Sequence, residues 1–306
     1  MVNKVFDAKE LRVIRLFDPW RSPLCTCPIK YSLHPYTGCS HYCLYCYASS
    51  YIGRKPSIVK KDLLKNISSD LRKLGNDQII ELSTSSDPYP PIEKDLEVTR
   101  SVLKLLLNYN VKLLITTKSD LVVRDIDVLS RTRSAVMITI TTLDDKISTI
   151  LEPGAPLPRQ RIYAVKALSK SGIPVGVRID PVIPFINDDP HMMGEIIAYV
   201  KEAGAQHVVT STYKAKWDSL ARLQDSFPEI ASKLREYYVS KGSRIHGYMY
   251  LPKDLRRSML KPIVKMCMRY GLTVATCREG LGNEFFNAPS CDGSHLIGKQ
   301  PCALHR

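Results

Sequence analysis

The chain has 306 residues, of which 44% are hydrophobic, and this is enough for one large α/β domain or two small ones. It contains no long apolar run, and its first 15 residues alternate charged and apolar types, so we expect no membrane-spanning segment, no signal peptide and a cytoplasmic location. The net charge is +14, and residues 201–306 carry 17 Lys and Arg against 9 Asp and Glu. This excess suits a nucleic acid or another polyanion as partner, and a lysine-rich solvated surface explains it equally well.

Short apolar runs rich in β-branched residues alternate with helical patterns along the first two thirds of the chain. In chain order the expected strands are Tyr31–Tyr36, Gln78–Ser83, Val111–Thr116, Ala135–Thr141, Pro174–Ile179 and His207–Ser211. The expected helices between them are Lys61–Leu74, Leu96–Asn108, Pro158–Ser171 and His191–Ala203. This alternation predicts a parallel sheet with crossover helices and six βα units by Ser211.

The last third is expected to add helix, strand, helix and strand at Trp217–Lys241, Ile245–Leu251, Lys253–Tyr270 and Thr273–Cys277. An irregular tail rich in Gly, Pro and Cys follows. The expected organisation is an N-terminal extension (1–30), a barrel (31–215) and a basic C-terminal extension (216–306). Within the extension, five basic residues at helical spacing are expected to place several charges on one face, namely Lys253, Arg256, Arg257, Lys261 and Lys265.

Polar clusters follow most of the expected strands. They are Cys39–Cys46, Ser83–Asp87, Thr116–Ser119, Thr141–Asp144 and Arg178–Asp180. In βα architectures the reactive groups lie at the carboxyl ends of the strands. The clusters therefore indicate one mouth of one barrel.

The first of these clusters carries three cysteines, Cys39, Cys43 and Cys46, in the spacing C-x₃-C-x₂-C. Three thiolates within eight residues can face one metal centre from one loop, and iron–sulfur cubes take cysteine ligands at such short spacings. Three ligands leave one iron open for a cofactor or substrate. A structural zinc site with His41 as the fourth ligand is the alternative.

With an aromatic residue before the last cysteine, this loop resembles the signature of the radical S-adenosylmethionine (radical SAM) superfamily. The resemblance implies a partial (βα)₆ TIM-like barrel with a C-terminal α/β extension, and a [4Fe–4S] cluster that reductively cleaves S-adenosylmethionine to a 5′-deoxyadenosyl radical. It also implies an electron donor such as ferredoxin or flavodoxin. By this resemblance Tyr45 packs on the adenine.

Further stretches resemble the branch around spore photoproduct lyase, also labelled DNA repair photolyase-like. They are Pro35–Ala48, Ser83–Glu93, Thr117–Asp125, Thr139–Asp144, Leu151–Arg161 and Pro181–Pro184. In that lyase a cysteine three residues before the aspartate of the second stretch returns a hydrogen atom to the product. Here this position is Thr84, whose O–H bond is too strong for that step, so the resemblance carries the cofactor site and not the substrate.

The other barrel residues receive roles from their chemistry. Ser83, Thr84 and Ser85 suit the methionine ammonium, and Thr141 and Thr142 suit the ribose hydroxyls. The methionine carboxylate is expected to bind Arg161 or Arg178, although a structural pair between Arg178 and Asp180 explains that arginine equally well. Asp87, Lys118 and Glu152 are each explained by a ligand contact or by a structural role.

The tail adds further cysteines, and its segment Cys291-Asp-Gly-Ser-His295 resembles the second half of the CDGSH iron–sulfur motif. The first half of that motif, a C-x-C, is absent upstream, and the C-x-C of this chain is Cys25-Thr-Cys27. One interpretation is an auxiliary metal site drawn from Cys25, Cys27, Cys277, Cys291, His295 and Cys302. Another is that these are free structural cysteines, and a third is that Cys277 or Cys291 is the catalytic hydrogen donor.

The leading hypothesis is a radical SAM enzyme that modifies or repairs a nucleic acid, DNA or RNA. A radical SAM enzyme acting on a small molecule, lipid or peptide is the alternative. A non-catalytic metal-binding nucleic-acid module is the third. The formation of 5′-deoxyadenosine separates the first two from the third, and salt-dependent nucleic-acid binding separates the first from the second.

Overall fold

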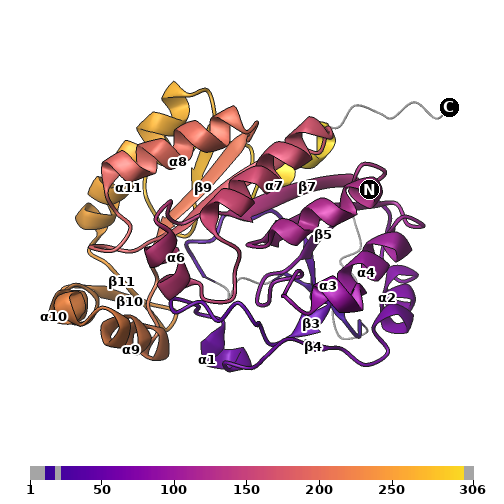
Figure 1. The fold of residues 1–306 in the computed structure, drawn as a ribbon, viewed down its shortest axis with the longest axis horizontal. Helices are drawn as coiled ribbons and strands as arrows, with labels where there is room; N and C mark the ends of the chain where they lie inside the picture. The colour runs from indigo at the N-terminus through magenta and orange to yellow at the C-terminus, as the bar shows by residue number, and fades with distance from the viewer. Residues whose placement is uncertain (1–10, 18–21, 300–306) are drawn as a thin grey trace.

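A computed structural model describes residues 11–17 and 22–299, and its centre is an eight-stranded, mostly parallel sheet (Figure 1). The order of its strands is β1-β2-β5-β6-β7-β8-β9-β12. Only β1 is antiparallel to its neighbour. The strands are β1 (Ile14–Leu16), β2 (Tyr31–Leu33), β5 (Gln78–Leu82), β6 (Val111–Thr117), β7 (Arg133–Thr139), β8 (Val175–Val182), β9 (His207–Thr212) and β12 (Thr273–Thr276).

The six expected βα units are present, and their strands lie side by side in chain order from β2 to β9. Strands such as β7 are buried along almost their whole length because both faces of the sheet are covered. The expected α/β fold with a parallel sheet is therefore confirmed. β12, which comes from the expected C-terminal extension, pairs with β9 and adds the eighth strand.

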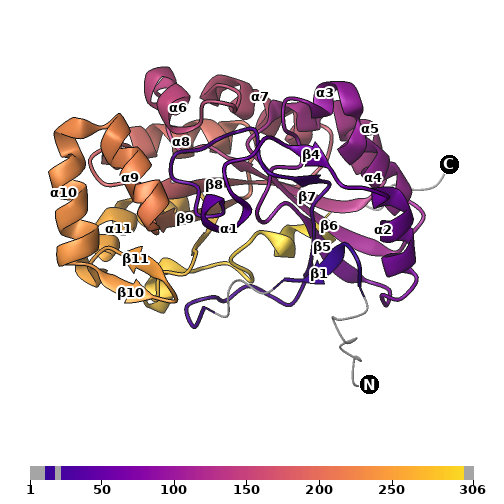
Figure 2. The same cartoon turned by 90° about the horizontal axis from the view of Figure 1, so that it is seen from below.

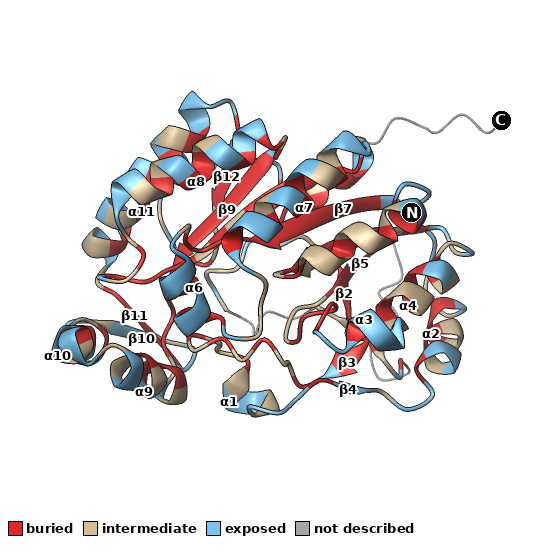
Figure 3. Cartoon of the chain, viewed as in Figure 1, coloured by how far each residue is buried: buried red, intermediate tan, exposed pale blue. Residues whose placement is uncertain are grey.

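Helices cover the outer face of the sheet and direct their apolar sides towards it (Figure 3). Local signals fix their starts: Asp144 caps α6 and Asp189 caps α8, each accepting backbone N–H groups of the first turn. The helices up to β9 are α1 (Ser49–Ile52), α2 (Leu63–Leu71), α3 (Glu93–Leu96), α4 (Val98–Leu106), η2 (Asp120–Asp125), α5 (Ile126–Leu129), α6 (Asp145–Leu151), α7 (Pro158–Lys170) and α8 (Pro190–Glu202).

The C-terminal third forms a group of short elements at one end of the sheet (Figure 2) and one long outer helix, α11 (Lys253–Arg269). The single helix expected over Trp217–Lys241 is wrong, because Pro228 has no N–H to continue it. The elements of this group are α9 (Trp217–Ser226), η3 (Pro228–Ile230), α10 (Ala231–Arg235), η4 (Glu236–Ser240) and the hairpin of β10 (Ser243–Ile245) and β11 (Tyr248–Tyr250). Two short helices follow β12: η5 (Asn283–Phe285), and η6 (Ser294–Lys299), which packs against β6 and β7.

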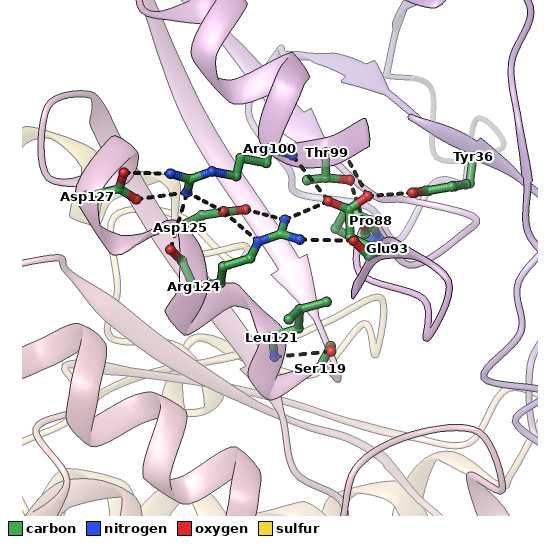
Figure 4. A network of polar contacts seen from close by, with 10 residues as sticks. All are labelled: Tyr36, Pro88, Glu93, Thr99, Arg100, Ser119, Leu121, Arg124, Asp125 and Asp127. Atoms are coloured by element: carbon green, nitrogen blue, oxygen red, sulfur yellow. Dashed lines mark hydrogen bonds and ion pairs between the residues drawn. The ribbon is translucent and has the colours of Figure 1, made fainter. Parts of the chain in front are cut away.

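A network of ion pairs joins the segments that follow β5 and β6 (Figure 4). The buried carboxylate of Glu93 lies 2.6 Å from Nη2 of Arg124, and Nε of Arg124 lies 2.9 Å from Asp125. Nη1 of Arg100 binds the same Asp125 at 2.8 Å. Two of the stretches quoted for the family resemblance are thus held against each other at the mouth of the barrel.

Within the described residues, no helix combines the length and apolar character that crossing a membrane requires.

Candidate active site

A cavity of about 220 Å³ opens at the carboxyl ends of the parallel strands. Most of the polar clusters expected at strand ends contribute to its lining, and they are joined by residues that follow β9 and β12 and by the segment before β2. The expectation of one mouth of one barrel agrees with this arrangement.

The three-cysteine loop forms one wall of the cavity. It begins after β3 (Tyr36–Thr37) and runs into α1, and the chain then returns to β4 (Ile58–Val59), which pairs with β3. Gly38 has a φ of +76°, and a Cβ there would lie 2.2 Å from the carbonyl oxygen of Pro56. Gly154 approaches from the other side, where a Cβ would lie 2.0 Å from the carbonyl oxygen of Ser40. Two close backbone contacts, each of which requires a glycine, therefore hold the loop in place.

Cys39, Cys43 and Cys46 all line the cavity. Burial raises the pKa of the Cys39 thiol to about 11, and burial likewise raises the pKa of Cys43. Among the residues that the structure describes, no three His, Cys, Asp or Glu side chains are placed to hold a single ion, so the zinc alternative with His41 is not supported. A cube binds each thiolate through a different iron and does not require that convergence, so the donor set fits a cluster.

Asp87, which follows β5, ties the cysteine loop to the next strand. Its carboxylate accepts hydrogen bonds from the Thr117 hydroxyl at 2.6 Å and from the backbone N–H of Lys118 at 2.8 Å, and it lies 3.3 Å from Nδ1 of His41. Burial opposes the charged form, but His41 and these hydrogen bonds outweigh it and lower the pKa of Asp87 to about 2. Asp87 is thus a charged acceptor that fixes the loop.

Tyr45 faces the cavity with its ring and is held from behind by a buried pair. Its hydroxyl donates to Glu152, which also forms an ion pair with Arg161. Burial raises the pKa of Glu152, but the charges of Arg161 and Lys118 outweigh it and lower the pKa below its usual value. The Lys118 ammonium lies 5.6 Å from the centre of the Tyr45 ring, inside the cavity.

This arrangement corrects the role considered for Arg161. The guanidinium does not line the cavity and binds Glu152 and the carbonyl oxygens of Thr139 and Pro156 instead. Arg178 does line the cavity, 2.5 Å from Asp180, so the structural pair weighed for it is present. Burial raises the pKa of Asp180, but Arg178 and Lys214 outweigh it and lower that pKa.

The expected ribose contacts are also placed elsewhere. Thr141 and Thr142 do not line the cavity. The Thr141 hydroxyl donates to Glu152, and the Thr142 hydroxyl accepts from the backbone N–H of Asp144. Thr139, which lies two residues before Thr141 at the end of β7, is the residue of this strand that lines the cavity.

The serine and threonine residues after β5 are organised by His34, which the sequence reasoning missed. Its Nε2 accepts the backbone N–H groups of Thr84 and Ser85, both at 3.1 Å, and lies 2.8 Å from the Thr84 hydroxyl. Ser83 lies in the left-handed region with a φ of +81°, so the chain turns sharply before these donors. His34 directly follows β2, and its place at a strand end was the signal that could have identified it.

We expect the stability that His34 contributes to be lost as the pH is lowered. Burial lowers the pKa of His34 to about 4 from an unfolded value near 6.5, so its contribution is complete above pH 6.5 and is lost as the pH falls towards 4. The loss should reach about 3 kcal/mol. Urea unfolding should be measured for wild type and His34→Gln from pH 7.5 to pH 4.5. The free energy of unfolding of wild type should exceed that of the variant at pH 7.5, and this difference should be lost towards pH 4.5. The matched control is His191→Gln, since that side chain is 83% exposed, and a constant difference for both variants would contradict the assignment.

Arg278, which lines the cavity, belongs to a set of neighbouring aromatic rings and cations that come mostly from the C-terminal third. The Arg278 guanidinium lies over the rings of Tyr47 and Tyr248, 5.4 Å and 5.2 Å from their centres. The Lys216 ammonium lies 4.1 Å from the centre of the Tyr248 ring. Trp217 is 53% exposed, and Arg244 lies over its ring at 5.4 Å.

The expected basic face of α11 needs one correction. Arg256 is buried, because it binds the carboxylate of Glu279 at 3.0 Å, and Glu279 also binds Lys214 at 2.8 Å. The remaining four residues of the expected set are exposed: Lys253, Arg257, Lys261 and Lys265.

The candidates for an auxiliary metal site separate into two groups. Cys25, Cys27 and Cys277 line the cavity, and Cys291 lies against Cys27. The His295 ring instead packs edge-on against His207, with 4.7 Å between the ring centres, and Cys302 lies outside the described residues.

Comparison with known proteins points to one family. Residues 33–209 match the model of the radical SAM superfamily. An uncharacterised protein of Methanocaldococcus jannaschii is 35% identical over 201 residues, which cover 63% of this chain and 74% of that protein. A radical SAM Nalpha-GlyT isomerase of Pseudomonas phage M6 is 23% identical over 289 residues, which cover 86% of this chain and 59% of that protein.

The fold also resembles solved structures. Spore photoproduct lyase with bound AdoMet and dinucleoside spore photoproduct superposes with a TM-score of 0.64 and 15% identity, covering 88% of this chain and 80% of the lyase. SuiB of Streptococcus suis, bound to S-adenosylmethionine, superposes with a TM-score of 0.52 and 15% identity, covering 80% of this chain and 49% of that one.

Proposed function

This chain belongs to the radical SAM superfamily, and from this premise we propose that it is a [4Fe–4S] enzyme that modifies or repairs a nucleic acid. The family implies an iron–sulfur cluster, S-adenosylmethionine and an electron donor, for which ferredoxin or flavodoxin is suitable. Cys39, Cys43 and Cys46 would hold the cluster. When bound, this cluster and S-adenosylmethionine supply a 5′-deoxyadenosyl radical that takes a hydrogen atom from the substrate.

The protein's own residues prepare the cavity for that chemistry. Tyr45, held by Glu152, presents an aromatic face for the adenine. The hydroxyls and carbonyls from Ser83 to Ser85, fixed by His34, suit the methionine ammonium. Arg178 offers a cation for the carboxylate but keeps its contact with Asp180. Because these side chains are positioned by buried partners, they are organised before the cofactor enters.

The observation that supports a nucleic-acid substrate is the combination of aromatic rings and cations at the mouth. Exposed rings offer stacking surfaces for unstacked bases, and adjacent cations suit the phosphates. Trp217, which is 53% exposed, forms such a pair with Arg244. The neighbouring Lys216 packs on the buried ring of Tyr248, which in turn contacts Arg278 at the cavity. Spore photoproduct lyase, which shares the fold, has been solved with a dinucleoside bound. Repair of spore photoproduct is not part of the proposal, because Thr84 stands where that lyase has its donor cysteine.

The deciding experiment is product analysis after anaerobic reconstitution. The enzyme, S-adenosylmethionine and a reductant are incubated with single-stranded DNA, duplex DNA, tRNA and DNA that contains spore photoproduct. We expect one nucleic acid to stimulate formation of 5′-deoxyadenosine and to yield a nucleoside of altered mass. Spore photoproduct should not be converted to thymine. Stimulation by small molecules or peptides alone would reject the nucleic-acid substrate but keep the radical SAM activity.

Trp217→Ala is expected to weaken nucleic-acid binding by about 5- to 150-fold, because stacking one base on an aromatic side chain contributes about 1–3 kcal/mol. Binding by wild type should also fall by roughly 10³-fold or more between 50 and 200 mM salt, if several phosphates are neutralised. Fluorescence anisotropy with a labelled single strand measures both effects. Tyr163→Ala is the matched control, since Tyr163 is 64% exposed on α7. Equal affinities of both variants would argue against this surface.

A further inference from the structure

Four cysteines from three distant segments meet at one side of the cavity, apart from the three-cysteine loop. Eight cysteines are described, and none of them forms a disulfide. Three belong to the loop, and Cys267 is buried in the apolar core. The remaining four are Cys25, Cys27, Cys277 and Cys291. We refer to them as the four-cysteine group.

Their sulfur atoms are close although the residues are far apart in the sequence. Sγ of Cys27 lies 3.4 Å from Sγ of Cys291, across a separation of 264 residues. Cys25 shares a hydrogen bond with Cys27. Cys277 directly follows β12 and lies within electrostatic range of the other three. Each segment therefore brings its thiol to the same place.

A buried ion-pair cluster holds two of these segments together. The ammonium of Lys30, which is 2% exposed, lies 2.5 Å from Asp292 and 2.6 Å from Glu81. Asp292 also accepts the backbone N–H of Ser294 at 2.9 Å. The segments that carry Cys27 and Cys291 are thus joined by a charged contact inside the protein, which is costly unless its geometry is well defined.

The group lies between apolar side chains and a set of cations. Cys27 and Cys291 pack with Ala275 and Ala288, and Cys277 packs against a second small apolar cluster. Free structural cysteines are usually buried among apolar side chains, as Cys267 is. Cys277 differs from Cys267 in that it also interacts electrostatically with Arg178 and Arg278, and all three residues line the cavity. Together with Lys30, these cations can compensate the negative charge that several metal-bound thiolates carry. Thiols in this setting are better explained as ligands than as packing.

We propose that Cys25, Cys27, Cys277 and Cys291 bind a second iron–sulfur cluster. The four thiols lie close together, but in the described part of the chain no three of them are spaced to bind one metal ion. A cluster distributes four thiolates over two or more irons and does not require such convergence. His295 and Cys302, considered in the sequence analysis, are not needed for this site.

The second cluster differs from the first in its protein ligands. Four cysteines leave no iron open, whereas the three-cysteine loop leaves one. The second cluster is therefore a one-electron centre at the wall of the same cavity and has no open position for S-adenosylmethionine. This proposal does not rest on the proposed function, because it can be tested without S-adenosylmethionine turnover and without substrate.

The test uses the full chain with Cys39, Cys43 and Cys46 all replaced by alanine. After anaerobic reconstitution this variant should retain about two or about four irons per chain and a similar amount of acid-labile sulfide. Its electron paramagnetic resonance signal should not respond to S-adenosylmethionine. Adding Cys27→Ser or Cys291→Ser should remove most of this iron, whereas adding Cys267→Ala, the control, should leave it unchanged.

Two results would overturn the proposal. One is a triple variant that folds, as judged by circular dichroism, but retains neither iron nor sulfide. The other is retained iron that Cys27→Ser and Cys291→Ser do not reduce, because such iron is adventitious. If the triple variant does not fold, Mössbauer spectra of ⁵⁷Fe-reconstituted wild type decide. Two cluster species, one of them shifted by S-adenosylmethionine, support the proposal, and a single species that shifts completely overturns it.

Discussion

Replacing Cys39, Cys43 and Cys46 together by alanine is expected to abolish the formation of 5′-deoxyadenosine. These thiols are the proposed ligands of the cluster, and without them S-adenosylmethionine would have neither a binding iron nor a source of its electron. In an anaerobic assay with dithionite as reductant, the amount of 5′-deoxyadenosine measured by liquid chromatography should fall from that of a turning-over enzyme to background. The wild-type resonance signal that responds to S-adenosylmethionine should disappear as well.

Cys267→Ala is the matched control for this prediction. It removes the same side chain from the buried face of α11, in the apolar core, with no contribution to the cavity lining. The control should lower stability and keep the yield of 5′-deoxyadenosine. Formation of 5′-deoxyadenosine by the triple variant at the wild-type rate would reject this loop as the site of cleavage.

Arg161→Leu is expected to lower the free energy of unfolding by about 3–5 kcal/mol. The guanidinium and the carboxylate of Glu152 are almost completely buried, with side-chain exposures of 1% and 0%. Removing the arginine leaves a carboxylate that water cannot reach, and this is the costly half of a broken buried pair. Urea unfolding of the apoprotein, followed by circular dichroism, measures the change.

An exposed pair of the same type provides the control. Arg133 and Asp77 are 48% and 51% exposed, so Arg133→Leu should cost no more than about 1 kcal/mol. The double variant Arg161→Leu with Glu152→Leu should be less destabilised than the sum of its single variants, because no unpaired charge remains. A cost for Arg161→Leu as small as that for Arg133→Leu would show that the pair is not needed. Loss of S-adenosylmethionine binding at unchanged stability would restore the cofactor role first considered for Arg161.

The repeating βα order could be predicted because short local stretches of sequence encode each strand and helix. Strands such as β6 and β7 are short, mostly apolar runs that contain β-branched residues, and helices such as α8 begin with a capping aspartate and proline. β1 could not be predicted in this way. Its position depends on Asp70 of α2, which accepts the backbone N–H groups of Arg12, Val13 and Ile14 from 56 to 58 residues away.

The same division holds for the candidate site. The placement of polar groups at the mouth follows from strand direction alone, so the sequence was enough for Asp87 and Lys118. It was not enough for His34, whose role depends on a loop 50 residues later. It also could not separate Arg161 from Arg178, because both are arginines after or within apolar runs, and only the buried carboxylate of Glu152 distinguishes them.

By itself the sequence indicated the family, and through it the iron–sulfur and S-adenosylmethionine chemistry that the family implies, because the three-cysteine signature lies within eight residues and its thiols stay near one another whatever the rest of the chain does. Only the tertiary structure decided which other residues share the cavity. Cys27 and Cys291 can be ligands of one proposed centre only because a buried ion pair joins Lys30 to Asp292, which lies 262 residues later in the chain. Sequence spacing carries information over a few turns of chain, whereas the burial of charges and the partners that satisfy them are set by the packing of distant segments.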